Sequence, residues 1–161
     1  MTADTDRLLT RVAIDALIAE FAWRIDHGES ASVAELFTED GWYGREDGSR
    51  SVGRDAIRNA YAARAARGER TARHIFTNLR LTVDGPDRAH GTCILLLFAA
   101  DGAPPHPAVP QLVQDYEDVY HRIDGQWLFA QRGVRRLFVA EDFAPVLPLG
   151  TGQTGKTEEP R

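Results

Sequence analysis

The sequence predicts an α+β fold, because its helix-like segments come first and a run of strand-like segments follows. In the N-terminal half, apolar residues recur at intervals of three and four, which is the period of an amphipathic helix. From about residue 72 the period changes, and strand-like segments alternate with turn residues. That order favours an antiparallel sheet over a parallel, doubly wound one. The 161 residues fit one domain, expected over residues 1–144, with a flexible tail over residues 145–161.

Three helices are predicted before the long strands begin. The first runs from about residue 5 to 27, and Gly28 is a natural residue to end it. A serine at position 30 or 32 is expected to cap a short second helix that ends near residue 37. The third helix runs from residue 54 to about residue 67. The apolar stripes of the first and third helices are Ile14, Leu17, Ile18, Phe21 and Ile25, and Ile57, Tyr61 and Ala65.

Strand-like segments make up most of the remaining chain. A short hairpin is predicted around Asp47-Gly48, and four longer strands follow near 72–84, 88–100, 111–123 and 126–140. The clearest turn is Asp124-Gly125, a residue pair that a tight type I′ hairpin turn prefers. In the first long strand, period two places one set of residues on each face. The two sets are Leu79, Leu81 and Val83, and His74, Phe76 and Asn78. This alternation does not decide which face meets a pocket.

Composition excludes several classes of function. The net charge is −5, from 24 acidic and 19 basic residues, so nothing favours nucleic acid or an anionic membrane as a partner. The single cysteine, Cys93, excludes a disulfide framework, and its apolar neighbours predict a buried, inert thiol. No stretch approaches the roughly 20 apolar residues of a membrane span, so a cytoplasmic protein is expected. The histidines show no metal-ligand spacing, and neither a metal nor a cofactor is predicted.

One motif near the C-terminus is rejected. Residues 150–157 match the phosphate-loop pattern letter for letter. That pattern binds phosphate only where a buried strand leads into the loop and a helix leaves it. Here the approach contains Pro145 and Pro148, which are poor residues in a central strand, and the sequence given leaves no room for a helix after Lys156. Nucleotide binding is therefore not predicted.

Two residues are candidates for acid–base chemistry. Asp26 lies in the last turn of the first predicted helix, where a carboxylate faces the negative end of the helix dipole, at a cost of about 0.3–1 kcal/mol when exposed. It borders the apolar stripe, about 100° from its centre at roughly 100° per residue. His74 lies on a predicted strand. By spacing alone, a solvated helix-flank acid and a hydrogen-bonded structural histidine are the commoner interpretations, so neither residue indicates a site by itself.

Five short segments, taken in order, carry a family resemblance. They are Arg24-Ile25-Asp26, the residues from Glu35 to Gly41, from Gly53 to Ile57, from Arg73 to Leu79, and from Arg122 to Phe129. Over about residues 5–140 they resemble the SnoaL-like branch (polyketide cyclase and scytalone dehydratase type) of the nuclear-transport-factor-2-like superfamily. This resemblance implies a cone-shaped barrel, in which a strongly curved, mostly antiparallel sheet packs on three helices around a deep pocket.

The resemblance also implies an activity. In scytalone dehydratase and hexachlorocyclohexane dehydrochlorinase, an aspartate at the end of the first helix orients a histidine on the sheet, and Asp26 and His74 match those positions. The implied function is a cofactor-independent lyase or isomerase, of the dehydratase or cyclase type, acting on a small hydrophobic cyclic or aromatic molecule. The candidate substrate contacts are Trp42, Tyr43, Phe98, Tyr116 and Arg132. Because Ile25 stands where a tyrosine is expected, the substrate and the reaction subtype are left open.

Other interpretations stay open beside this one. The same fold serves as the non-catalytic small subunit of ring-hydroxylating dioxygenases and as a ligand-binding module. A limonene-type epoxide hydrolase needs an Asp-Arg-Asp arrangement around a water, and no motif here identifies one. The run from Thr92 to Phe98 is apolar on both faces, which predicts a homodimer or homotrimer that associates through the outer face of the sheet.

Overall fold

The computed structural model describes residues 3–143, 147, 149 and 150. Its elements are α1 (Ala3–Asp26), the 3₁₀ helix η1 (Ser30–Leu36), β1 (Phe37–Arg45), β2 (Arg50–Val52), α2 (Arg54–Ala65), β3 (Arg70–Gly85), β4 (Arg88–Asp101), β5 (Leu112–Ile123) and β6 (Gln126–Val139). The predicted α+β order is confirmed, and each long strand lies within two residues of its expected bounds. Most of the predicted tail, with nearly all of the phosphate-loop pattern, lies outside the described residues.

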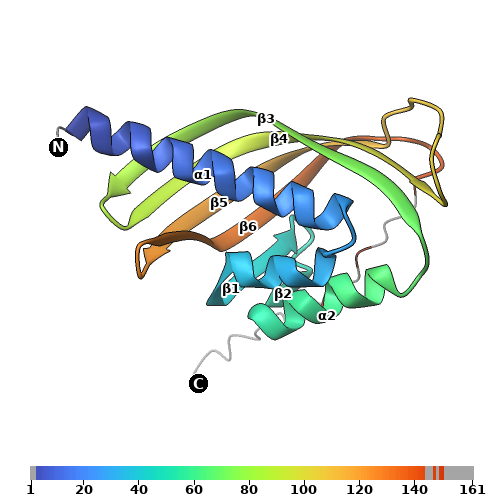
Figure 1. Ribbon diagram of the computed structural model, residues 1–161, viewed down its shortest axis with the longest axis horizontal. Helices are drawn as coiled ribbons and strands as arrows, with labels where there is room; N and C mark the ends of the chain where they lie inside the picture. The colour runs from blue at the N-terminus through green and yellow to red at the C-terminus, as the bar shows by residue number, and fades with distance from the viewer. Residues whose placement is uncertain (1–2, 144–146, 148, 151–161) are drawn as a thin grey trace, which may run out of the picture.

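The strands form one six-stranded sheet in the order β2-β1-β6-β5-β4-β3. Every neighbouring pair is antiparallel except β1 and β6, which are parallel. Asp124 and Gly125 join β5 to β6 with φ angles of 50° and 81°, the two positive values that a type I′ turn requires. Figure 1 shows a curved sheet with α1 lying across one face, and η1 and α2 beside β1 and β2. The curved sheet and the helices enclose the interior of a cone.

Phe21 anchors the C-terminal half of α1 to the sheet. It is fully buried, and its ring makes edge contacts with the rings of Phe37, Tyr61, Phe76 and Phe129 at centroid distances of 5.7–6.3 Å. Such pairs contribute about 0.5–1.5 kcal/mol each beyond the burial of their area. The predicted stripe of α1 is confirmed, since Ile14, Leu17 and Ile18 are also buried. This packing fixes the end of the helix that carries Asp26.

Two local predictions are wrong. The hydroxyl of Ser32 does not cap η1 but donates to the carbonyl of Glu29 at 2.7 Å. In β3, strict alternation fails because the register against β4 shifts between Thr77 and Arg80, and Asn78 has a φ of 56°. A bulge of this kind adds one residue to the strand and reverses which face later side chains take. As a result, Phe76 and Leu79 both pack against the core, although period two placed them on opposite faces.

Candidate active site

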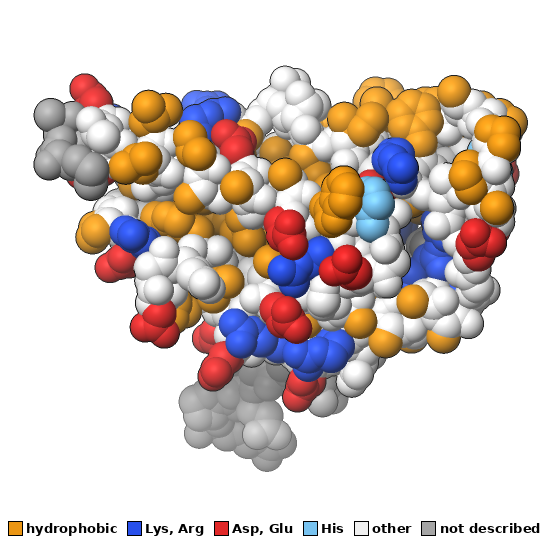
Figure 2. All heavy atoms as spheres, viewed as in Figure 1, with side chains coloured by type: hydrophobic (Ala, Val, Ile, Leu, Met, Phe, Trp, Pro, Cys, Tyr) orange, Lys and Arg blue, Asp and Glu red, His pale blue; other side chains and the backbone are white. Residues whose placement is uncertain are grey.

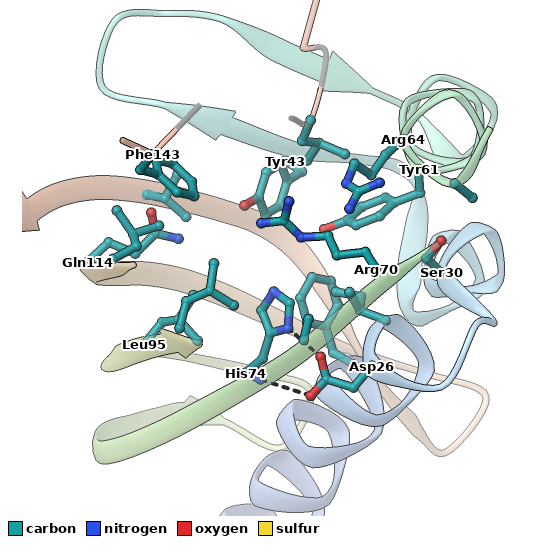
Figure 3. Close-up of a pocket in the computed structure, with 18 of the residues that line it drawn as sticks. Asp26, Ser30, Tyr43, Tyr61, Arg64, Arg70, His74, Leu95, Gln114 and Phe143 are labelled. Carbon is teal, nitrogen blue, oxygen red and sulfur yellow. Dashed lines mark hydrogen bonds and ion pairs between the residues drawn. The ribbon is translucent and has the colours of Figure 1, made fainter. Parts of the chain in front are cut away.

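The carboxylate of Asp26, at the end of α1, contacts the imidazole of His74 on β3. Asp26 Oδ1 lies 2.6 Å from His74 Nδ1, and the backbone N–H of His74 donates to Asp26 Oδ2 at 2.8 Å (Figure 3). The Asp26 side chain is 6% exposed and that of His74 is 15% exposed. Hydrogen bonds that involve an ionised group are about twice as strong as neutral ones. The two bonds stabilise the acid at the unfavourable end of its helix and hold the ring in one orientation.

His74 projects into a cavity of about 360 Å³ inside the cone. The apolar part of the wall includes Phe21, Ile25, Leu95, Leu97, Leu112 and Val134. In Figure 3 the imidazole points away from the Asp26 carboxylate and into this space, so its second nitrogen, Nε2, faces the cavity. Within the described residues, Nε2 has no hydrogen-bond partner. A nitrogen that is free, aimed at a mostly apolar cavity and opposite a bound carboxylate is available to accept a proton.

A chain of hydrogen bonds crosses the far wall. The Gln114 amide donates to the Tyr116 hydroxyl oxygen at 2.9 Å, and the hydroxyl oxygens of Tyr116 and Tyr43 lie 3.3 Å apart. Burial raises the pKa of Tyr116 well above its ordinary value, with a further contribution from Tyr43, so this hydroxyl keeps its proton. Burial likewise raises the pKa of Tyr61, another residue of the wall. The cavity therefore offers neutral O–H donors.

Two of the five predicted substrate contacts line this cavity. Tyr43 and Tyr116 are in its wall, whereas the described lining does not include Trp42, Phe98 or Arg132. Trp42 is half-buried, and the guanidinium carbon of Arg50 lies 4.5 Å from its ring centroid. Phe98 is half-buried on β4. Ile25, which stands where the resemblance expects a tyrosine, does line the cavity.

Arg132 forms a fully buried ion pair instead. Its Nη2 donates to Asp118 Oδ2 at 3.2 Å, and both side chains are 0% exposed. Its guanidinium carbon lies 4.2–4.8 Å from the centroids of the four rings that surround it, those of Phe21, Phe76, Tyr116 and Phe129. Burial raises the pKa of Asp118 to about 6, although Arg132 opposes that rise. Two of these four rings, those of Phe21 and Tyr116, also line the cavity.

The structure also bears on the cysteine, on metal sites, on membrane helices and on the Asp-Arg-Asp arrangement. The predicted burial of Cys93 is confirmed, and burial raises the pKa of its thiol to about 12, which disfavours the reactive thiolate. Among the described residues, no three histidine, cysteine or acidic side chains are grouped so that they could hold a metal ion. None of the helices in the described part of the chain is long and apolar enough to cross a membrane. Asp26 is the only aspartate in the described cavity lining, so an Asp-Arg-Asp arrangement is not formed there.

Sequence reasoning missed the basic side of the cavity. Four arginines, namely Arg45, Arg64, Arg70 and Arg136, contribute to its lining. Figure 2 shows a hollow on the right of the molecule, near the end of α1, with side chains coloured as Lys or Arg inside it. The one available signal was the alternation of Arg70, Ala72 and His74 along β3, which places all three on the same face of the strand. Nothing in the sequence indicated which of the many arginines would gather there.

The fold defines a class of protein. A cone of curved sheet and helices around an internal cavity is the cystatin-like fold of nuclear-transport-factor-2-like proteins, and solved structures described in those terms resemble this chain. Residues 6–133 match the model of the SnoaL-like domain. The chain belongs to this family, as the sequence resemblance predicted. None of the curated proteins compared with the chain matches its sequence.

Three solved structures illustrate the similarity. The D26N variant of Rv3472, a Mycobacterium tuberculosis protein of unknown function, is 30% identical, with a TM-score of 0.75 over 88% of this chain and 80% of that chain. A Novosphingobium aromaticivorans protein, named as a candidate scytalone dehydratase, is 19% identical, with a TM-score of 0.77 over 96% and 99%. A hexachlorocyclohexane dehydrochlorinase, LinA type 2, is 21% identical, with a TM-score of 0.69 over 89% and 98%. The last two likenesses establish a shared fold.

Proposed function

We propose that the protein is a cofactor-independent lyase or isomerase in which His74 removes a proton from carbon. The observation that carries this proposal is the 2.6 Å contact between Asp26 Oδ1 and His74 Nδ1 at the wall of a largely apolar cavity. The names of two structural neighbours, a candidate scytalone dehydratase and a dehydrochlorinase, support the same class of reaction, because both names describe eliminations.

The proton moves from substrate carbon to His74 Nε2. Asp26 accepts the hydrogen bond of Nδ1–H, which leaves the lone pair of Nε2 directed at the cavity. The electrons of the broken C–H bond form an enolate next to a carbonyl, or a double bond as a leaving group departs from the neighbouring carbon. The imidazolium formed in this step is stabilised by the Asp26 carboxylate, and the low polarity of the surroundings strengthens that attraction. Protonation of the product, or of the leaving group, then restores the neutral ring.

Tyr43 supplies a hydrogen bond to the substrate oxygen in this scheme. Because the Tyr116 oxygen accepts from Gln114, the Tyr116 O–H is free to donate to the oxygen of Tyr43. The O–H of Tyr43 is then left to point at a ligand. A donor placed where negative charge develops stabilises the transition state more than the ground state. We assign this role to Tyr43, which is buried and lines the cavity.

The proposal is tested with two histidine variants of opposite expectation. Cyclic β-hydroxyketones, both neutral ones and ones that bear a carboxylate, serve as a substrate panel, and loss of water is followed by the absorbance of the conjugated enone. His74→Ala should abolish turnover of whichever member reacts. His90→Ala is the matched control, because His90 also pairs with an aspartate, Asp84, at 2.8 Å, but on the surface and outside the described cavity lining. Full activity in His74→Ala would contradict the assignment of the base.

The outer face of the sheet supports a second proposal, that copies of the chain associate there. Ile75, Leu96, Val113 and Phe138 pair in register across β3, β4, β5 and β6 and form one apolar row. Ile75 is 47% exposed and Phe138 is 69% exposed, so much of this row meets water in the single chain. Continuous apolar surface of this kind commonly marks a protein interface. A non-catalytic small subunit would use the same row to contact a larger chain, but that role leaves the buried acid–base pair without a purpose.

A further inference from the structure

Positive charge is concentrated on one side of the cavity of an otherwise acidic protein. The chain has a net charge of −5, yet its cavity is lined by four arginines and only two acids, Asp26 and Glu69. Asp26 is committed to His74 through both of its oxygens, and Glu69 is exposed. The acids of the described lining therefore do not neutralise the arginines, and the proposed mechanism gives these arginines no task.

Two of these guanidinium groups form no ion pair with any of the described residues. Within the described part of the chain, neither Arg64 nor Arg136 has a hydrogen-bond or ion-pair partner for its side chain. Arg70 contacts Asp101 at 3.3 Å, but that carboxylate is 83% exposed and therefore weakly held. Burial lowers the pKa of Arg64, and the positive charge of Arg70 lowers it further, while the exposed carboxylate of Asp101 opposes this shift only in part. Arg64 and Arg70 are therefore two partly buried cations that repel each other, and an anion that binds between them stabilises both.

The positions of Arg64 and Arg70 relative to Asp26 and His74 suit a bound ligand. Arg70 and His74 lie four residues apart on the same face of β3, a Cα separation of about 13 Å at roughly 3.3 Å per residue. In Figure 3 the side chains of Arg64 and Arg70 lie beside the rings of Tyr43 and Tyr61, across the cavity from Asp26. The length of an arginine side chain shortens the remaining gap to His74. A small molecule held at one end by the arginines therefore presents its other end to the base.

We infer that the substrate carries a carboxylate, which Arg64 and Arg70 bind, while an apolar ring fills the cavity and directs its acidic C–H toward His74. The planar guanidinium matches a carboxylate with two parallel hydrogen bonds. A carboxylate fits better than a phosphate, because the remaining wall is mainly apolar and a doubly charged group costs more to remove from water. This inference rests on the proposed function for the reaction, but recognition of the anion can be measured without turnover.

The test compares two probes of the same shape. 2-Naphthoate carries a carboxylate, and 2-naphthamide replaces it with a neutral amide, so the pair isolates the contribution of the charge. Binding of each probe is measured by isothermal titration calorimetry to the wild-type protein, Arg64→Gln and Arg70→Gln. Arg67→Gln is the matched control, because Arg67 is an exposed arginine of the same α2–β3 connection and is outside the described cavity lining. Thermal unfolding of each variant confirms that it is folded.

We expect 2-naphthoate to bind wild-type protein at least tenfold more tightly than 2-naphthamide, a difference of about 1.4 kcal/mol. Arg64→Gln and Arg70→Gln should each remove most of that preference without changing the affinity for the amide. The inference is overturned if the two probes bind equally, if Arg67→Gln is as damaging, or if naphthoate shows no saturable binding below about 1 mM. His74→Ala separates this result from the proposed function: it should keep the preference for the acid, even though it is expected to abolish catalysis.

Discussion

The replacement Asp26→Asn tests whether Asp26 determines which ring nitrogen of His74 carries the proton. In the native protein Asp26 Oδ2 accepts the backbone N–H of His74, and Oδ1 lies 2.6 Å from Nδ1. An asparagine of the same shape keeps the first bond through its carbonyl oxygen, which turns its NH₂ group toward Nδ1. Because NH₂ only donates, Nδ1 must then accept, and the single ring proton moves to Nε2. The nitrogen that faces the cavity becomes a donor and can no longer act as the base.

The expected loss is large in rate and modest in stability. General-base catalysis contributes about 10²–10⁴ in rate, and each factor of ten corresponds to about 1.4 kcal/mol in the barrier. Asp26→Asn should therefore lower kcat by about 10²–10⁴. One charge-assisted hydrogen bond is weakened, so the free energy of unfolding should fall by no more than about 1.5–3 kcal/mol.

Two measurements check this prediction independently. Turnover of the β-hydroxyketone identified in the panel gives kcat, with Asp84→Asn as the control for the same change in the exposed aspartate–histidine pair. Nitrogen-15 NMR of labelled histidine reports which ring nitrogen of His74 carries the proton, and it needs no substrate. The reasoning is refuted if Asp26→Asn keeps more than about a tenth of kcat, a barrier change below about 1.4 kcal/mol, or if the proton of the variant stays on Nδ1.

Three further predictions concern other parts of the molecule. Tyr43→Phe should lower kcat about 10- to 10³-fold, because it removes one donor from the substrate oxygen; unchanged steady-state kinetics would exclude this role. Phe138→Asp should shift the protein toward the monomer in sedimentation velocity, since it places a charge in the apolar row, and a wild-type protein that is already monomeric would contradict self-association. Arg132→Met should lower stability by about 3–5 kcal/mol by leaving Asp118 buried without a counter-charge, whereas Arg135→Met, in an exposed ion pair, should change little. Burial raises the pKa of Asp118 to about 6, so this carboxyl is mainly neutral at pH 4.5, which favours the folded state, and is ionised at pH 7, where it needs the charge of Arg132. The loss of stability in Arg132→Met should therefore be larger at pH 7 than at pH 4.5 in thermal unfolding, and an equal loss would refute this.

The sequence pattern predicted the helices, strands and turns well, because each of these is determined by residues that are close together in the chain. The stripe of α1 ends in Phe21 and Ile25, and the type I′ turn at Asp124-Gly125 needs only its own two residues. The contact between Asp26 and His74 depends on how α1 crosses β3, which spacing along the chain does not encode. It was accessible only through the family resemblance. Arg64 and Arg70 had no such support, since a basic residue near a helix end or a strand start is usually solvated.

The bulge in β3, which the sequence did not predict, allows one strand to line the cavity in one half and to pack against α1 in the other. If strict alternation continued past Asn78, a strand that directs His74 and Phe76 inward would direct Leu79 and Leu81 outward. The bulge at Asn78 reverses the alternation, so these leucines also pack against the core. The half of β3 nearest the cavity therefore delivers the base, and the half beyond the bulge packs as an apolar surface along α1, where the Leu79 carbonyl accepts a hydrogen bond from Arg11. Because α1 is held along its length by the same strand that carries His74, the helix end and the imidazole keep a fixed separation, which is the condition for a 2.6 Å contact to orient a base.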